Sequence, residues 1–209
     1  MKMYELEPES PTPGRVGAAR PYRMSARARS AEVTGERILD AMLARFAVAP
    51  FDAITLDEIA NEAGVTVQTV IRRFGGKAGV LRAVVARELG RIAAAREGTM
   101  RDSAAQTLAA LVDHYEHYGL LILKFYAEAP LVEGLPELAV QGRGFHVDWC
   151  RRVFDARIAT DDPVLHRVRS AQVVAICDAT TWRILRFDGG LDPAETERAL
   201  GELLAPLLT

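Results

Sequence analysis

The chain lacks several features that would assign it to a membrane or secreted class. No apolar run approaches the roughly 20 residues that a membrane-spanning helix needs, and the N-terminus has no apolar core typical of a signal peptide. The sequence therefore predicts a cytoplasmic protein without membrane contact. Cysteine is scarce: Cys150 and Cys177 both lie in apolar helical stretches, which predicts two buried small side chains and no disulfide framework.

Signatures of common enzyme classes are absent as well. The sequence has no nucleophile elbow, phosphate-binding loop, dinucleotide-binding glycine motif or H-E-x-x-H zinc motif. Most Asp and Glu residues fall at expected helix starts, where capping and the helix dipole explain them. We therefore expect a protein that is not an enzyme and that needs no cofactor.

Two histidines raise the question of a metal site. His114 and His117 are three residues apart, so they lie near each other on a helix, and Asp113, Glu116 or His146 could add a ligand. Two histidines are too few to define a site, and solvated or hydrogen-bonded histidines are the common alternative. The sequence therefore predicts no metal.

The composition and the spacing of apolar residues indicate an all-α protein. Apolar residues make up 49% of the chain and charged residues 26%, and the helix-favouring residues Ala, Leu, Arg and Glu dominate. No segment alternates polar and apolar residues as a strand does. The predicted helices span residues 31–48, 55–63, 66–74, 77–95, 103–128, a short irregular 131–140, 143–159, 163–187 and 193–208.

The chain divides into three parts. Residues 1–23 are rich in Pro and Gly and poor in large apolar residues, which predicts a disordered tail, and Met24 is an alternative start of the protein. Residues 24–76 carry the first three helices and residues 77–209 carry the others. The net charge is +3 up to residue 91 and −5 beyond it. A basic front suits contact with DNA, although charged faces are usually only solvated.

Residues 55–74 are the most informative segment. Thr55 and Glu58 make a capping box, Gly64 suits a left-handed turn, and Thr66 caps a second short helix. This pattern predicts a helix-turn-helix whose second helix exposes Thr66, Gln68, Thr69, Arg72 and Arg73. Such a helix fits the DNA major groove, about 12 Å wide, while the first helix crosses the phosphate backbone. A generic helical hairpin with a solvated arginine pair is the alternative.

The same segment resembles the TetR family of repressors. The residues that match the family's motif are Thr55, Ile59, Ala60, Ala63, Gly64, Val65, Thr66, Thr69, Val70, Phe74 and Lys77. The resemblance implies an N-terminal three-helix DNA-binding domain, a C-terminal helical domain for ligand binding and dimerisation, and a homodimer on a palindromic operator. The DNA-binding residues that we expect are Thr55, Thr66, Gln68, Thr69, Arg72, Arg73 and Lys77.

Ile71 departs from the family's pattern. Many members carry a tyrosine there whose hydroxyl contacts a phosphate, so Ile71 removes one anchoring contact. Arg72, Arg73 and Lys77 are expected to offset this loss. An N-terminal arm adds four more arginines, which are Arg20, Arg23, Arg27 and Arg29. Phosphate contacts from such an arm would position the protein without reading the base sequence, and a solvated arm is the alternative.

The last two predicted helices indicate a dimer. The 163–187 helix is apolar nearly all round, so both of its sides must be covered, and a second subunit is the simplest cover for one of them. The last helix adds Leu200, Leu203, Leu204, Leu207 and Leu208. The resemblance also places the last two helices at the dimer interface. Burial within one monomer is the alternative.

Aromatic residues cluster in the 103–128 and 143–159 helices. Small-molecule pockets are mostly apolar with a few orienting polar groups, and the lining that we expect is Tyr115, Tyr118, Ile122, Phe125, Phe145, Trp149 and Trp182. Such a set predicts a small hydrophobic or aromatic effector that releases a repressor from DNA. The alternatives are that these side chains are ordinary core, and that the protein is a DNA-binding regulator or architectural protein with no small-molecule ligand.

Overall fold

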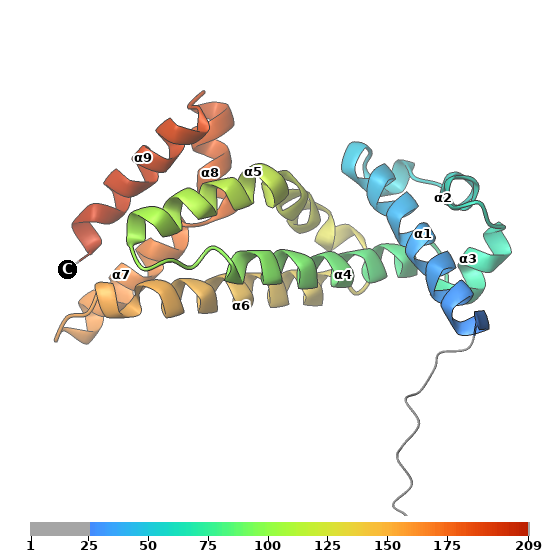
Figure 1. Cartoon of the computed structure of the whole chain (residues 1–209), viewed down its shortest axis with the longest axis horizontal. Helices are drawn as coiled ribbons and strands as arrows, with labels where there is room; N and C mark the ends of the chain where they lie inside the picture. Colours follow the sequence, from blue (N-terminus) through green and yellow to red (C-terminus); the bar gives the residue numbers. More distant parts are fainter. Residues whose placement is uncertain (1–25, 209) are drawn as a thin grey trace, which may run out of the picture.

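The computed structural model describes residues 26–208, and over this range the chain is helical and without strands. Helices α1 (Ala26–Val48), α2 (Leu56–Ala63) and α3 (Val67–Phe74) gather at one end of an elongated molecule (Figure 1). The long α4 (Lys77–Glu97) runs from that end into the other. There it meets α5 (Ala104–Glu128), α6 (Leu135–Phe154), α7 (Pro163–Ile176), α8 (Ala179–Arg183) and α9 (Pro193–Leu204). The all-α prediction is confirmed.

Some of the sequence predictions lie outside the described residues. These are the disordered tail over residues 1–23, the alternative start at Met24, the arm residues Arg20 and Arg23, and the side chain of Arg27. Within the described residues, every helix is too short or too polar to cross a membrane.

Local hydrogen bonds fix the short helices α2 and α3. The Thr55 hydroxyl accepts from the backbone N–H of Glu58 (3.2 Å), and the Glu58 carboxylate accepts from the backbone N–H of Thr55 (2.8 Å), so the predicted capping box is confirmed. Gly64 ends α2 with a φ of 63°, which glycine adopts without strain. Thr66 then caps α3 by accepting from the backbone N–H of Thr69 (3.3 Å).

The three N-terminal helices share one core with α4. Ile38 and Met42 of α1, Ile59 of α2 and Val70 of α3 are all fully buried. The first turns of α4 contribute Val80, Leu81, Val84 and Val85. The start of α4 is therefore built into the packing of the helix-turn-helix.

Arg87 ties α4 to α1 by ion pairs. Its Nη1 lies 2.8 Å from the carboxylates of both Glu36 and Asp40 on α1, and its Nε lies 2.8 Å from Glu88. Glu88 is buried and needs a cationic partner there. Charge pairing as well as apolar packing therefore fixes α4 against the N-terminal helices.

The end of α5 also reaches the N-terminal helices. The ring of Phe125 stacks on the ring of Phe46 in α1, with centroids 5.3 Å apart and planes 17° from parallel. The backbone N–H of Phe51 donates to the Glu128 carboxylate (3.4 Å), and the Lys124 ammonium lies 4.8 Å from the centre of the Phe46 ring. The last turns of α5 are thus part of the core that holds α1.

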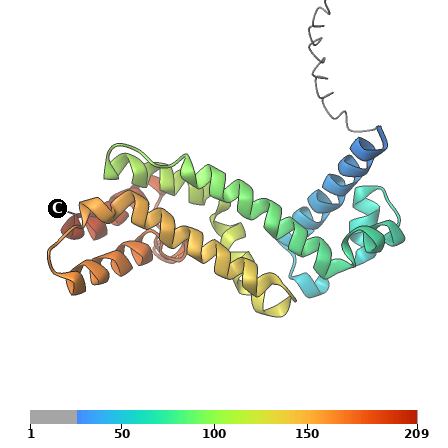
Figure 2. The ribbon, with the colours of Figure 1, turned by 90° about the horizontal axis from the view of Figure 1, so that it is seen from below.

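Helices α4 and α6 run side by side (Figure 2), and α6 corrects the sequence prediction. The sequence predicted separate helices over 131–140 and 143–159, whereas the structure has one continuous helix. Gly142 lies inside it and is buried, and a Cβ there would come within 3.0 Å of the Tyr126 hydroxyl and 3.2 Å of Leu89. The glycine marks close packing of α4, α5 and α6 and not a break in the helix.

The predicted helix over 163–187 is wrong as well, because the structure divides it into α7 and α8. Asp162 caps α7 as predicted. Asp178 then caps α8 by accepting from the backbone N–H of Thr180 (2.7 Å). Apolar residues continue on both sides of this junction, so the second cap was hidden within an apolar stretch.

Helix α9 begins as predicted and ends earlier. Asp192 and Glu195 form a capping box at its start, and the helix ends at Leu204 instead of residue 208. Pro206 follows, has no backbone N–H to donate, and lies in a short 3₁₀ turn.

Candidate DNA-binding surface and ligand cavity

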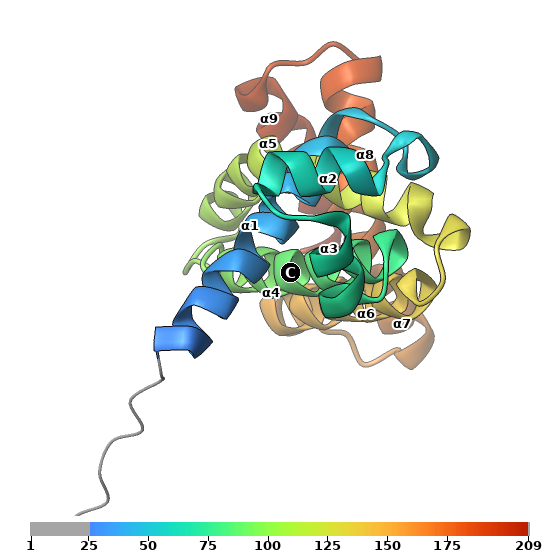
Figure 3. The ribbon, with the colours of Figure 1, turned by 90° about the vertical axis from the view of Figure 1, so that its right-hand side faces the viewer.

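Helix α3 lies at the outer end of the molecule with α1 and α2 (Figure 3). Val70 faces the core and is fully buried, whereas Gln68, Ile71 and Arg72 are exposed. Because Ile71 and Arg72 come three and four positions after Gln68, both lie on the same side of the helix as Gln68. An amide and a guanidinium on this face can contact base edges and phosphates.

The three predicted threonines lie at helix starts. Thr55 belongs to the capping box of α2, and the hydroxyl of Thr66, the cap of α3, lies 3.0 Å from the hydroxyl of Thr69. Thr55 and Thr66 are exposed and Thr69 is half-buried. In the described structure these hydroxyls serve first to fix the two short helices.

Two predicted DNA contacts lie beside the exposed face. The Arg73 guanidinium packs against α1 at Gly35, where a side chain would collide with it, and lies 5.7 Å from the centre of the Phe74 ring. The Lys77 ammonium donates to the Phe51 carbonyl (2.9 Å) and lies 4.3 Å over the Phe51 ring. Both cations therefore help to hold the N-terminal helices together.

Arg37, which the sequence analysis missed, holds the turn between α2 and α3. Its Nε donates to the Ala63 carbonyl (2.9 Å) and its Nη2 to the Gly64 carbonyl (3.1 Å). The dipole of α2 favours a cation at this C-terminal end. Arg37 and Ala63 are 26 residues apart, so no local pattern reveals the contact.

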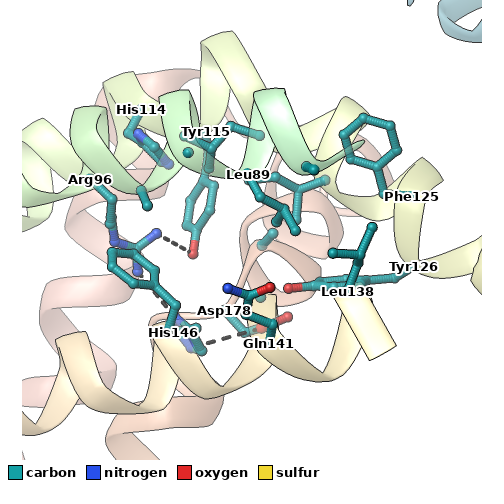
Figure 4. A pocket seen from close by; sticks show the side chains of 18 residues that line it. Leu89, Arg96, His114, Tyr115, Phe125, Tyr126, Leu138, Gln141, His146 and Asp178 are labelled. Atoms are coloured by element: carbon teal, nitrogen blue, oxygen red, sulfur yellow. Dashed lines mark hydrogen bonds and ion pairs between the residues drawn. The ribbon is translucent and has the colours of Figure 1, made fainter. Parts of the chain in front are cut away.

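The second site is a cavity of about 310 Å³ between α4, α5, α6 and the junction of α7 and α8 (Figure 4). Its apolar and aromatic wall includes Leu89, Ile92, Phe125, Tyr126, Leu138 and Phe145. The volume is at the lower end of the range for small-molecule pockets, about 300–1,000 Å³. The cavity is therefore large enough for a small organic ligand.

The cavity brings together four of the seven residues predicted for it, namely Tyr115, Ile122, Phe125 and Phe145. Tyr118, Trp149 and Trp182 lie outside its lining. The two tryptophans are almost fully buried, and their indole N–H groups donate to the Arg96 carbonyl (3.1 Å) and the Glu116 carboxylate (2.9 Å), respectively. Both indoles are thus part of the packed core beside the cavity.

Polar groups collect around Arg96, which the sequence analysis missed. Its guanidinium donates to the Tyr115 hydroxyl (2.7 Å) and contacts Nδ1 of His146 (3.2 Å). The Tyr115 hydroxyl in turn donates to the Cys177 carbonyl (2.7 Å). A basic residue in the last turn of a helix usually remains in water, so no local pattern predicts this buried position.

Burial changes the titration of two groups beside Arg96. Burial, with the charge of Arg96 adding to it, lowers the pKa of His114 to about 3, so His114 is neutral at pH 7. Burial also raises the pKa of Tyr115 above its usual range, although the charge of Arg96 opposes this shift. Both side chains are therefore neutral walls of the cavity under ordinary conditions.

The histidines of the possible metal site are in different environments. His114 is buried, whereas His117 is exposed. Over residues 26–208, no group of three or more His, Cys, Asp or Glu side chains is arranged to hold a metal ion.

Helices α7 and α9 and the π-helical segment Ile184–Asp188 after α8 expose large apolar side chains in the single chain. Val164 and Val168 of α7 are 56% and 46% exposed, Phe187 is 53% exposed, and Leu203 of α9 is 48% exposed. Part of the apolar character of the 163–187 region is therefore on the surface of the monomer.

The fold and the exposed α3 define a helical protein that pairs an N-terminal helix-turn-helix with a cavity-bearing helical body. Residues 38–84 match the family model of bacterial regulatory proteins of the tetR family. The chain is also 48% identical over 59 residues to the HTH-type transcriptional regulator SrpR of Pseudomonas putida, a match that spans 28% of each protein. The N-terminal domain is therefore similar to that of the TetR family, as its motif predicted.

Solved structures extend the likeness to the whole fold. A transcriptional regulator from Rhodococcus sp. Rha1 has a TM-score of 0.66 at 18% identity, over 83% of this chain and 95% of that one. SmeT in its complex with triclosan has a TM-score of 0.62 at 20% identity, over 84% and 92% of the two chains. The cavity-bearing body thus shares its architecture with these regulators while its sequence has diverged.

Proposed function

We propose that the protein is a cytoplasmic transcriptional repressor that binds a palindromic operator as a homodimer and is released by a small hydrophobic or aromatic effector. The observation that carries the proposal is the exposed face of α3 in a TetR-family helix-turn-helix, joined by α4 to a body with an apolar cavity. Residues 24–76 form the DNA-binding domain, and residues 77–209 form the ligand-binding and dimerisation domain. We assign the protein no catalytic role.

In this proposal Gln68 and Arg72 read base edges from α3. A glutamine pairs with adenine and an arginine with guanine in the major groove. Thr55, Thr66 and Thr69 contact phosphates at the starts of α2 and α3, where free N–H groups and the helix dipole favour an anion. This division separates sequence reading from positioning.

Arg73 and Lys77 contribute to DNA binding in a second way. Their packing against α1 and against the turn before α2 orients α3, and their charges add to the field that attracts phosphates. Replacing Lys77 therefore weakens binding to all sequences and leaves the base preference unchanged.

The exposed apolar side chains of α7 and α9 support a dimer. In a two-fold dimer the same patch of each copy forms the interface, so the exposed apolar residues of one copy can be buried against those of a second copy. The two-fold axis would then present two α3 helices about 34 Å apart, or a multiple of this distance, to successive major grooves. A palindromic operator follows from this symmetry.

Two elements connect the cavity to the DNA-binding domain. Helix α4 lines the cavity with its second half and packs on α1 with its first half. Phe125 lines the cavity and also stacks on Phe46 of α1. A ligand that displaces Phe125 would move α1, and with it α3.

A ~100-fold preference of the ligand for the displaced form supplies about 2.7 kcal/mol of coupling. SmeT, a protein of the same fold, forms a complex with the small molecule triclosan.

Selection of binding sites from a random duplex library by the full-length protein tests the proposal. We expect a palindromic site, and Gln68→Ala should change the preferred base, with a cost of about 1–3 kcal/mol for a lost base contact. Gln106→Ala, which removes an exposed glutamine at the start of α5, is the matched control and should change nothing. The proposal fails if no sequence is selected, or if the Gln68→Ala/Arg72→Ala variant keeps the wild-type preference.

The same preparations test the assembly. The chain mass is 22.9 kDa, and sedimentation should give twice this value. Leu203→Glu should lower the sedimenting mass because the side chain is exposed in the single chain. Trp182 is buried within the monomer, so a charge at that position would report on folding instead. A stable monomer that binds the full palindrome tightly would contradict the dimer.

A further inference from the structure

Arg96 carries a positive charge that no carboxylate neutralises within the described part of the chain. The residue is 4% exposed, and its guanidinium lies 4.0 Å from the centre of the Trp149 ring. Over residues 26–208 it forms no ion pair, and its Nε has no hydrogen-bond partner. The Tyr115 hydroxyl and the His146 ring explain its position, but no carboxylate pairs with it, and a desolvated cation without such a partner costs free energy until an anion joins it.

Asp178 is the acidic residue that lines the same cavity as Arg96. Its Oδ1 accepts from the backbone N–H of Thr180 (2.7 Å), and its Oδ2 lies 3.8 Å from Nε2 of His146. The Asp178 side chain is 37% exposed, so water already solvates its charge. The cavity therefore contains one desolvated cation and one solvated acid, and this imbalance favours an anionic ligand over a cationic one.

The cavity is also polar at one end and apolar at the other. In Figure 4, Arg96, the Tyr115 hydroxyl and His146 lie at one end, and Phe125 and Leu138 lie at the opposite end. A volume of about 310 Å³ suits one small molecule with a single charged end. A carboxylate is a monoanion of suitable size that forms charge-assisted hydrogen bonds with a guanidinium.

We propose that the cavity binds monoanionic amphiphiles, with the carboxylate held at Arg96 and the apolar part extending toward Phe125 and Leu138. This inference rests on the proposed function in taking the cavity as the effector site, and it specifies the chemical class of the effector. The apolar and aromatic wall alone would predict a neutral ligand, whereas Arg96 predicts a ligand that carries a negative charge.

Three probes with the same alkyl chain and different head groups test this on the wild-type protein. Decanoate, decanol and decyltrimethylammonium are titrated below their micelle concentrations, and calorimetry gives the affinity and the stoichiometry. Decanoate should bind once per chain and about tenfold or more tightly than decanol, as expected for a charge-assisted hydrogen bond in a buried site. Decyltrimethylammonium should bind most weakly. Equal affinity for decanoate and decanol, tighter binding of the cation, or no binding of any probe would overturn the proposal.

Charge variants sharpen the test. Arg96→Met should abolish the preference for decanoate over decanol, and Arg96→Lys should restore part of it. Arg143→Met is the matched control, because Arg143 lies outside the lining, exposed and 5.2 Å from the Tyr126 ring, and it should keep the preference. Asp178→Asn keeps a good helix cap and should strengthen decanoate binding. An Arg96→Met protein that melts cooperatively and still prefers decanoate would overturn the assignment of the head group.

The operator experiment separates this inference from the proposed function. If decanoate binds with the expected preference but does not release the operator, the ligand class stands and the switch is wrong. If an uncharged apolar compound binds the cavity and releases the operator while decanoate does not bind, the switch stands and the ligand class is wrong.

Discussion

The two ends of the molecule differ in how completely they are packed. At the end that holds α1, α2 and α3, the residues Ile38, Met42, Phe46 and Val70 are fully buried in one continuous core. The body instead contains a cavity of about 310 Å³ beside Arg96, whose Nε has no hydrogen-bond partner among the described residues. A densely packed core deforms little. The side chains around a cavity, in contrast, lack contacts that would stabilise the folded state. The contrast shows an N-terminal end with a continuous core and a body that leaves room for a ligand.

Truncation of one phenylalanine at each end gives the largest expected difference. Phe46→Ala should destabilise the protein by about 3–5 kcal/mol, because it opens a void in a dense core and removes the stack on Phe125. Phe145→Ala extends a cavity that already exists and should cost only about 1–2 kcal/mol. Urea denaturation of both variants measures the two values. Equal losses would show that the cavity wall is packed as tightly as the N-terminal core.

A second prediction concerns acid sensitivity, which should arise in part at the cavity. His114 in the folded protein has a pKa of about 3, whereas in the unfolded chain it takes up a proton near pH 6.5. The unfolded state therefore binds more protons between these values, and stability should fall as the pH is lowered from about 6.5 toward 3.

The variant His114→Phe keeps the ring contacts with Tyr115 and Tyr118 and removes the titration. Its stability should depend less on pH in this window, by up to about 1.4 kcal/mol per pH unit. The exposed His117→Phe is the control and should keep most of the wild-type slope, because the charge of His117 is the smallest of the three causes that lower the pKa of His114. Unchanged acid sensitivity in His114→Phe would place the titrating group elsewhere.

The smallest effect is expected on the exposed face of α3. Ile71 is 40% exposed, and a tyrosine at this position would add a hydroxyl that can donate to a phosphate. Ile71→Tyr should tighten binding to operator and non-operator DNA alike, by about 0.5–1.5 kcal/mol. Ile71→Phe separates the hydroxyl from the ring, and fluorescence anisotropy measures both. A tyrosine variant no tighter than the phenylalanine variant would mean that no phosphate lies within reach.

Local sequence patterns predicted the N-terminal helices well because each element there carries its own signal. The capping and turn residues there interact only with neighbours a few positions away, so the sequence alone predicts their roles. These residues are Thr55, Glu58, Gly64 and Thr66. Arg37 is the exception, since its partner carbonyls at Ala63 and Gly64 become neighbours only after folding.

In the body, the predictions failed where tertiary packing decides. Gly142 suggests a break when read alone, but it permits close contact between helices. Helical spacing placed Tyr115 and Phe125 on α5 correctly, yet it does not separate a cavity wall from a core residue such as Trp149. A buried cation like Arg96 has no local signature, because its burial depends on rings and carbonyls supplied by distant helices.

The alkylation of the two free cysteines can measure how readily the helices of the body separate. Cys150 and Cys177 are 2% and 0% exposed, and Sγ of Cys150 lies 3.8 Å from Nε2 of His146 in the cavity wall. An alkylating reagent reaches such thiols only when the surrounding helices separate, so the labelling rate measures the free energy of that opening. A compound that fills the cavity must slow the alkylation of Cys150 by the factor by which it stabilises the closed body, whether or not DNA is present.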